Sequence, residues 1–416
     1  MLRMSSFIRT MDYFRKGLHL LFFLMLLPLG ISCCDEEREG VFSEHPDRTI
    51  LVYMIGDNNL WPFSDQNIGG MIEGMKNIHT TAHLLVYEDS NNHPPILWEI
   101  SRKENDSVYA EIEFEYEEQN SADPAVIKTV LNDAFRNFPS KEKGLILWSH
   151  GNGWLPTGGD SSYGFSRFLS DIQRVRRKSI GPDKNEYLEI WDLRESLEST
   201  GLYFDFICFD ACLMASVEVV YEMKDLTANF LASPTEIMGS GFPYSMMIPA
   251  MMKNEINYAT LCDLYMQYYD GRTANRCGSI SWVQTAGLSD LAETYRETIA
   301  GCNMSREQIL ACGMQQMGRL MYRSNGIVKD YTNIFFDLRD WMLHLSQSPE
   351  RIDELLRRIV AENLFTSKFG ISINGGEIID INRCCGLTVF IPEVCHNQIF
   401  LTAYKKLRWY KDVVYR

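Results

Sequence analysis

A histidine and a cysteine each stand at the end of an apolar run that is typical of a buried strand. The run 144–150 ends on His150, and Cys212 follows the run 204–209 by three residues. A thiol becomes a nucleophile near neutral pH only when a base or a positive charge stabilises the thiolate. Because parallel strands have their carboxyl ends at one edge of a sheet, we predict that these residues meet there as base and nucleophile.

The neighbours of this pair have types that suit the same chemistry. Gly151 lets the backbone come close to a substrate, and the amides of Gly151 and Cys212 are placed to bind an oxyanion. Asp210 lies two residues before Cys212 and is expected to point into the same site, where it would bind a basic side chain. A helix is expected directly after Cys212, and its N-terminal end would favour a thiolate. Spacing alone also fits a satisfied histidine and a core cysteine, so this alternative stays open.

Alternating strand and helix patterns position these residues. Continuous apolar runs with helical segments between them predict a parallel sheet that is covered by helices on both faces, which is an α/β architecture. Residues 95–101 and 108–115 alternate instead and predict an antiparallel hairpin at one edge. The expected buried strands are 49–56, 83–88, 144–150, 204–209 and 229–233, and the expected helices between them include 64–78 and 124–138.

The pattern becomes mainly helical from about residue 251. Ser348 and Pro349 form a good helix start. The expected elements of this region are helices at 286–301, 305–323, 333–346, 349–363 and 397–408, and one late strand at 386–392.

The first 34 residues are typical of an export signal. Four basic residues precede an apolar run over 18–31, which is shorter than the ~20 residues of a membrane span and suits a signal-peptide core. Cys33 or Cys34 follows, as at a bacterial lipoprotein processing site, where the thiol carries a lipid. An exposed acidic linker is expected over 35–47. We therefore expect an exported lipoprotein anchored in a bacterial cell envelope, with the outer-membrane surface as one candidate location; a plain secretory signal or a single membrane anchor is the alternative.

Several segments together resemble the clostripain family of cysteine peptidases. The resemblance implies a caspase-like α/β/α sandwich over 48–250, and a mainly helical region over 251–416 with a late strand returning to the core. It implies that His150 is the catalytic histidine and Cys212 the nucleophile of a Cys–His dyad. The matching segments, which run in order along the chain, are 53–60, 148–151, 209–218, 232–236, 239–244 and 386–392.

The resemblance also implies a substrate preference. Asp210 matches the acid in the pocket for the residue before the scissile bond, which the family prefers as Arg or Lys. A second acid, which often occurs near the position of Ser240, is missing here, and Glu236 is the nearest alternative.

The resemblance also implies a candidate maturation step, because some members of the family cut themselves between the histidine and the cysteine. A long segment separates His150 from Cys212 here. An ordinary solvated charge run is the alternative for its basic cluster. The candidate cleavage sites are Arg167, Arg174, Arg176, Arg177 and Lys178.

Composition restricts the partners. The 416 residues are 45% hydrophobic and 23% charged, as in a globular protein, and the net charge of −15 argues against a nucleic-acid partner. Protein or peptide substrates are expected, together with a membrane reached through a lipid anchor; the oligomeric state stays open.

No cofactor is expected to be required, and no metal ligands are assigned. Calcium is a candidate ligand, because some family members are helped by it and acids such as Asp57 and Asp160 offer oxygen atoms. Two other functions stay open: an inactive surface lipoprotein that binds a protein or glycan, and a hydrolase of another amide or ester.

Overall fold

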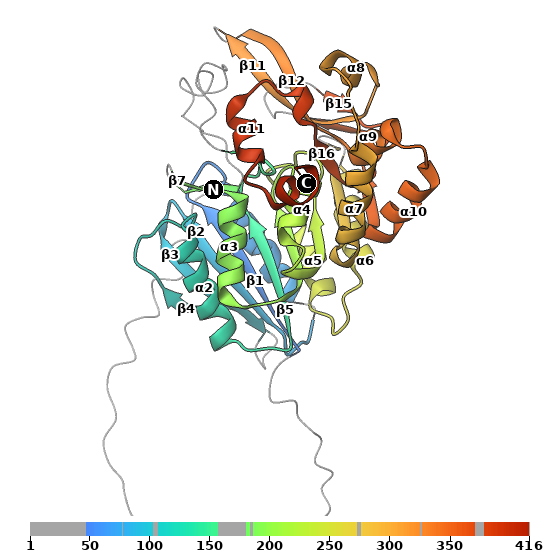
Figure 1. The fold of residues 1–416 in the computed structure, drawn as a ribbon. Helices are drawn as coiled ribbons and strands as arrows, with labels where there is room; N and C mark the ends of the chain where they lie inside the picture. Colours follow the sequence, from blue (N-terminus) through green and yellow to red (C-terminus); the bar gives the residue numbers. More distant parts are fainter. Residues whose placement is uncertain are drawn as a thin grey trace, which may run out of the picture. The chain divides into compact units, whose positions relative to one another are not determined.

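Figure 1 shows the fold in a computed structural model of the chain. The predicted signal peptide, Cys33 and Cys34, Asp160 and the candidate cleavage sites lie outside the residues that the structure describes, as does the linker up to residue 46. The described residues are 47–76, 78–102, 107–156, 180–183, 186–272, 276–324, 327–370 and 378–415.

A mostly parallel sheet forms the centre of the fold. The five central strands, from β9 to β2, are parallel, and antiparallel strands extend the sheet at both edges. Every residue of β1 is buried, as expected for a parallel strand with helices on both faces. In spatial order the nine strands among the described residues are β13 (Val360–Phe365), β10 (Ser279–Gln284), β9 (Thr227–Ala232), β8 (Phe204–Asp210), β5 (Glu142–Trp148), β1 (Arg48–Gly56), β2 (His83–Ser90), β3 (His93–Arg102) and β4 (Val108–Glu115).

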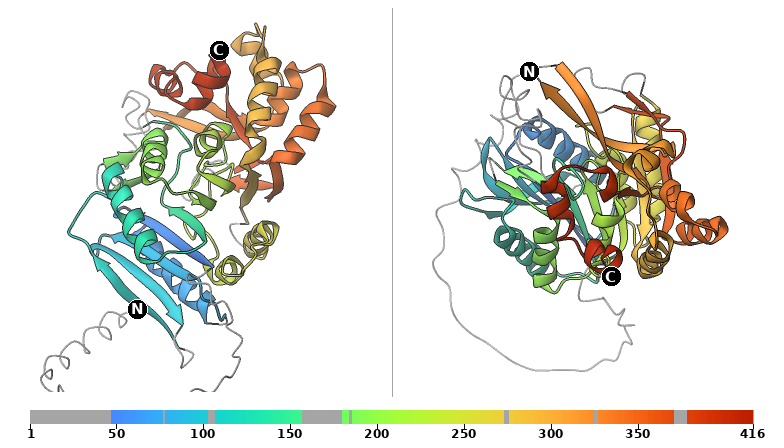
Figure 2. Two further views of the ribbon diagram at one scale, coloured as in Figure 1. Left: turned by 60° about the horizontal axis from the view of Figure 1, so that its bottom comes forward. Right: turned by 45° about the horizontal axis from the view of Figure 1, so that its top comes forward.

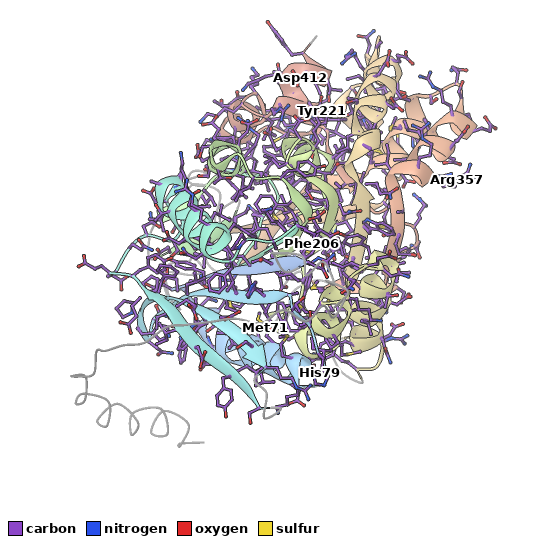
Figure 3. The ribbon with its side chains drawn as sticks, turned by 90° about the horizontal axis from the view of Figure 1, so that it is seen from below. Met71, His79, Phe206, Tyr221, Arg357 and Asp412 are labelled. Atoms are coloured by element: carbon purple, nitrogen blue, oxygen red, sulfur yellow. The ribbon has the colours of Figure 1, made fainter. Side chains whose placement is uncertain are left out.

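Helices cover both faces and make an α/β/α sandwich. On one face α1 (Trp61–Met75), α5 (Tyr244–Met251) and α6 (Tyr258–Asp270) bury apolar side chains against the sheet. On the other face α2 (Pro124–Asn137), α3 (Ile190–Thr200) and α4 (Val217–Met223) do the same. Figure 3 shows Met71 of α1 and Tyr221 of α4 on opposite sides of the sheet.

Local sequence explains where such helices begin. The Asp123 carboxylate accepts a hydrogen bond from the amide of Ala125, and Pro124 occupies the first turn of α2. The buried residues of α2 recur with a helical period and face the sheet.

The chain after residue 251 adds helices and a second sheet, drawn in yellow, orange and red in Figures 1 and 2. Besides α6, its helices among the described residues are α7 (Leu288–Ile299), α8 (Arg306–Ala311), α9 (Leu338–Leu345), α10 (Pro349–Ile359) and α11 (Gln398–Tyr404). Short 3-10 helices lie at Thr285–Gly287 and Pro392–Val394, and a π-helix lies at Tyr410–Val414. The second sheet has the order β11 (Gln316–Ser324), β12 (Ile327–Asp337) and β16 (Thr388–Phe390), and two-stranded pairs form from β14 (Lys368–Gly370) with β15 (Ile378–Asp380) and from β6 (Ile180–Asp183) with β7 (Glu186–Leu188).

This region contains more strand than its sequence pattern indicates. The helix prediction is wrong over 316–323 and 333–337, where β11 and β12 pair with each other. β-branched and aromatic residues are frequent in β12, and a pairing partner decides their conformation. The predicted helix at 349–363 ends at Ile359, and the chain continues into β13.

The central sheet therefore continues past residue 250. β10, which was not predicted, pairs with β9 and β13, so two strands of this region join the central sheet. The late strand is present as β16, whose residues are buried, and it pairs with β12. The predicted division into 48–250 and 251–416 stays a prediction.

No disulfide joins any of the nine cysteines in the described part of the chain. None of the helices in the described ranges is long and apolar enough to cross a membrane.

Candidate active site

Three loops at the carboxyl ends of neighbouring strands form the candidate site. From β1 the chain builds the sheet outwards through β2, β3 and β4, and it then returns to place β5 on the other side of β1. Ligands commonly bind at such a reversal of strand order. Asn59 follows β1, His150 follows β5 and Cys212 follows β8.

The strand register brings the histidine and the cysteine to the same height. Trp148 on β5 is paired with Asp210 on β8, so His150 and Cys212 each come two residues later. The backbones then touch, because a Cβ atom at Gly151 would lie 2.5 Å from the carbonyl oxygen of Cys212 and 2.8 Å from its nitrogen. Only glycine fits this contact without a shift of backbone.

The thiol of Cys212 is half-buried and lies against the backbone of Ile237. The Ile237 amide donates a hydrogen bond to Sγ at 3.2 Å, and Sγ lies 3.7 Å from the Ile237 carbonyl oxygen. An amide that donates to sulfur favours the thiolate over the thiol. Glu236, predicted as a substrate-binding acid, directly precedes Ile237 and is half-buried.

A sharp turn follows the cysteine. Leu213 has a φ of 64°, which is the left-handed region and is disfavoured for residues with a side chain. Two backbone hydrogen bonds hold the turn, from the amide of Leu213 to Thr235 O at 2.9 Å and from that of Ala215 to Ser233 O at 3.0 Å. Strain of this kind persists where the surrounding structure imposes it, often at active sites.

The expectation of a helix directly after Cys212 is wrong. The helix α4 begins at Val217, and the Ser216 hydroxyl caps it by accepting from the amide of Val219 at 3.3 Å. The left-handed residue and the two bonds to 233–235 keep 213–215 out of the helix. The Ile237 amide, not a helix end, is therefore the group that donates to the sulfur.

The His150 ring is held by a residue that sequence reasoning did not assign to the site. Its Nε2 lies 2.8 Å from Oδ1 of Asn59. An amide oxygen only accepts, so Nε2 carries the hydrogen and the lone pair is on Nδ1. The sequence contains one indication of this role, because Asn59 lies in a polar loop directly after a predicted strand.

The loop that carries Asn59 is fixed by its neighbour. The Asn58 side chain donates to Ile55 O at 2.9 Å and accepts from the amide of Leu60 at 2.8 Å. These bonds close a tight turn, so Asn59 has a defined position beside His150.

Asp210 is almost completely buried, with 2% of its surface exposed. Its Oδ2 accepts hydrogen bonds from the Phe242 amide and the Tyr244 hydroxyl, both at 2.9 Å. Oδ1 has no hydrogen-bond partner among the described residues. Burial raises the pKa of Asp210 to about 7, and the two hydrogen bonds offset part of that effect.

The segment before Phe242 lies directly over this carboxylate. Gly241 has a φ of 62°, and a Cβ there would lie 2.6 Å from Oδ2 of Asp210. Tyr269 donates to the Gly241 carbonyl at 2.7 Å, and its hydroxyl is 3.3 Å from that of Ser240. These hydrogen bonds fix the backbone of residues 240–241 next to the Asp210 carboxylate. Ser240 occupies the position where family members often have a second acid for substrate binding.

Three further acids gather near the carboxyl ends of β1 and β2, the third of them from the segment between β4 and α2. One oxygen each of Asp57, Asp89 and Glu118 lies within 4.8 Å of the others, a separation that fits the ligands of a single metal ion. Asp57 was named from the sequence as one of the acids that offer oxygen atoms to calcium, but no metal ligand was assigned.

Comparisons with known proteins identify the family of the chain. Residues 52–415 match the model of a peptidase family described as the clostripain family. No curated protein matches the chain.

Solved structures extend the likeness to nearly the whole chain. A secreted C11 cysteine protease from Bacteroides thetaiotaomicron is 24% identical with a TM-score of 0.75, covering 89% of this chain and 99% of that one. A secreted C11 cysteine protease from the same organism, in complex with an irreversible peptide inhibitor, is 28% identical with a TM-score of 0.71, covering 89% and 99%. An inactive zymogen C11 protease from Parabacteroides distasonis is 26% identical with a TM-score of 0.71, covering 88% and 98%.

Proposed function

The chain belongs to the clostripain family and is a cysteine protease, and we propose that it is an endopeptidase that cleaves after Arg or Lys with Cys212 and His150. The observation that carries this proposal is the strand register. His150 and Cys212 each follow a pair of matched residues on neighbouring strands by two positions, and the buried Asp210 lies two residues before the cysteine, which supports their proposed roles.

The first step is the formation of the thiolate. Nδ1 of His150 takes the proton of the Cys212 thiol, while Asn59 keeps the hydrogen on Nε2 and holds the ring. The amide of Ile237 stabilises the negative charge on sulfur. The imidazolium that results adds a second stabilising charge.

The second step is attack on the scissile carbonyl. The thiolate sulfur forms a bond to the carbonyl carbon, and the carbonyl oxygen takes the negative charge. We assign the amides of Gly151 and Cys212 to this oxyanion, because Gly151 brings the two backbones into contact. His150 then gives its proton to the leaving amine, and water releases the acyl group from the sulfur.

Asp210 supplies the preference for a basic residue. Its Oδ1 is buried without a partner in the described part of the chain, so a guanidinium or ammonium group would provide the missing hydrogen bonds and charge. Ser240 adds no second charge, so Glu236, which directly precedes Ile237, is the other acid that we assign to substrate binding.

The same specificity suits maturation by self-cleavage. The neighbour from Parabacteroides distasonis is described as an inactive zymogen, which supports an activation step in this chain as well. Cleavage at Arg167, Arg174, Arg176, Arg177 or Lys178 would cut between Pro156 and Ile180, where the described residues stop and resume.

Export and a lipid anchor complete the proposal. Two of the similar proteases are described as secreted, which supports export of this chain. The anchor rests on the sequence around Cys33 and Cys34, and metabolic labelling with a fatty-acid analogue tests it, with Cys33→Ala and Cys34→Ala as separate variants.

Hydrolysis of peptide reporters that differ only in the residue before the reporter group tests the peptidase proposal. Wild-type chain from Asp35, Cys212→Ala and His150→Ala would be compared. Cleavage after Arg or Lys that both variants lack is expected. Cleavage that persists in Cys212→Ala would refute the assignment of the nucleophile.

A further inference from the structure

A buried glutamate on α4 joins the segment after Cys212 to the second sheet. The Glu218 side chain is fully buried, and its Oε1 accepts a hydrogen bond from the backbone amide of Phe390 on β16 at 2.8 Å. Glu218 lies in the first turn of α4, whereas Phe390 comes 172 residues later in the chain. Burial raises the pKa of Glu218 to about 7, and the hydrogen bonds from the Phe390 amide and the Ser216 hydroxyl oppose this shift.

The strand β16 also holds the sharp turn that follows the cysteine. The amide of Thr388, the first residue of β16, donates to the carbonyl oxygen of Ala215 at 3.0 Å. Thr388 forms a parallel bridge with Ser216, and β16 lies beside α4 in Figure 1. Residues 213–215 are therefore hydrogen-bonded both to the segment 233–235 and to β16.

The other two strands of the second sheet contact the same turn. β12 places the Phe335 ring against Gly153, where a Cβ would lie 2.9 Å from Cζ of Phe335 and 3.1 Å from the carbonyl oxygen of Leu213. On β11, a Cβ at Gly318 would lie 3.0 Å from the Phe335 ring and 3.3 Å from Cδ2 of Leu213. The second sheet thus packs closely against Leu213, the residue directly after the nucleophile.

The loop that carries His150 touches β16 as well. Trp154, four residues after the histidine, is completely buried, and its ring lies edge-on to that of Phe390 with the ring centroids 4.9 Å apart. Tyr404 on α11 packs against both rings, with centroid separations of 5.2 Å and 4.8 Å. Phe390 therefore contacts both loops, because its amide binds Glu218 and its ring touches Trp154.

We propose that Glu218 is a positioning residue for the catalytic pair, and that it acts by holding β16 against the loops that carry Cys212 and His150. Its side chain need not touch the substrate or the reacting sulfur. A small displacement of a nucleophile lowers the rate strongly, because the reacting atoms must be held in near-attack geometry. The chain after residue 251 then contributes to catalysis without supplying a reacting group. This inference rests on the proposed roles of Cys212 and His150.

Glu222 offers a matched control on the same helix. It lies one turn further along α4, is 1% exposed, and its Oε1 accepts from the backbone amide of Arg408 at 2.5 Å. It also forms an ion pair with Arg194 at 3.2 Å. Loss of Glu222 is therefore expected to destabilise the fold at least as much as loss of Glu218, but its hydrogen bond leads to residue 408 and not to β16.

The test compares thermal unfolding with the rate at which an irreversible peptide inhibitor that ends in Arg labels Cys212. Full-length wild type, Glu218→Ala, Glu218→Gln and Glu222→Ala would be assayed well below the Tm of each variant. We expect both alanine variants to have a lower Tm. Glu218→Ala is expected to slow labelling at least ~10-fold, and Glu222→Ala to change it by less than about twofold. Glu218→Gln keeps an oxygen that accepts from the Phe390 amide, so its rate is expected to stay within about threefold of wild type.

Thr388→Pro tests the same link from β16 and keeps the test decisive if Glu218→Ala does not fold. It removes the amide that donates to Ala215 at the first position of a strand, where proline is tolerated. A loss of at least ~10-fold in the labelling rate is expected here too. A wild-type rate in Glu218→Ala or in Thr388→Pro, or equal losses in Glu218→Ala and Glu222→Ala, overturns the positioning role. A wild-type chain that takes up no label at Cys212 refutes the proposed function, and the positioning role falls with it.

Discussion

Replacement of Asp210 by Asn separates substrate selection from catalysis. The change is nearly isosteric, and the remaining amide oxygen can still accept from the Phe242 amide and the Tyr244 hydroxyl. The amide nitrogen would then take the place of Oδ1, which has no partner among the described residues. A donor would thus face the basic side chain of the substrate where an acceptor with negative charge stood before.

The expected magnitude follows from the burial of this group. Because Asp210 is 2% exposed, solvent screens its attraction for a bound cation very little. Loss of one partner of a buried charge pair costs roughly 2–5 kcal/mol, and each ~1.4 kcal/mol changes a rate or equilibrium constant tenfold. We therefore expect kcat/KM for an Arg reporter to fall by about 100-fold, taking ~3 kcal/mol as a central value.

The assay compares reporters that end in Arg, Lys and a neutral residue of similar length, at pH 8, where most of Asp210 is ionised. The neutral reporter is expected to change by less than about threefold, because Asp210 takes no part in the chemical steps. Asp263→Asn serves as the control for a general effect of one lost carboxylate, because Asp263 is an exposed acid on α6. Equal losses for the Arg and the neutral reporter would refute the reasoning and assign Asp210 a structural role.

Three other predictions test separate parts of the site. Since burial raises the pKa of Asp210 to about 7, the ratio of Arg to neutral cleavage is expected to rise with pH through about 7, and a flat ratio between pH 6 and 8 contradicts this. Asn59→Ala is expected to lower kcat by ~10- to 100-fold with a smaller change in KM, because it removes the hydrogen bond to Nε2 that helps to orient the His150 ring. An unchanged rate of the chemical step in single-turnover experiments would contradict this role of Asn59. Gly151→Ala places a Cβ 2.5 Å from Cys212 O, so it is expected to lower kcat at least ~100-fold and to reduce Tm, and activity close to wild type would exclude the amides of Gly151 and Cys212 as the oxyanion site.

The central sheet follows from the sequence because its strands carry a strong local signal. β1 and β8 are continuous apolar runs that stay buried, and the hairpin of β3 and β4 shows its alternation directly. A strand such as β10, with polar Ser279 and Ser281 among apolar residues, has no such signal. Its conformation is set by pairing with β9 and β13, which lie far away in the sequence.

The candidate site also contains residues that the sequence indicates and residues that it does not. His150 and Cys212 were identified because each ends a recognisable strand, and the register brings them to one height. Asn59 and Ile237 were not identified, because their role depends on a side-chain rotation and on a backbone amide whose direction no residue type encodes. The turn at Leu213 also has no local signal, since residues with side chains rarely adopt a positive φ.

Covalent trapping of the nucleophile tests the central claim most directly. The chain would be treated with an irreversible peptide inhibitor that ends in Arg, and the labelled cysteine would be located by mass spectrometry. Nine free thiols in the described part of the chain compete for the label, so the result discriminates among them. The account predicts a single adduct on Cys212 that His150→Ala slows at least ~100-fold. A label on another cysteine, or an equal rate of labelling in His150→Ala, would contradict it.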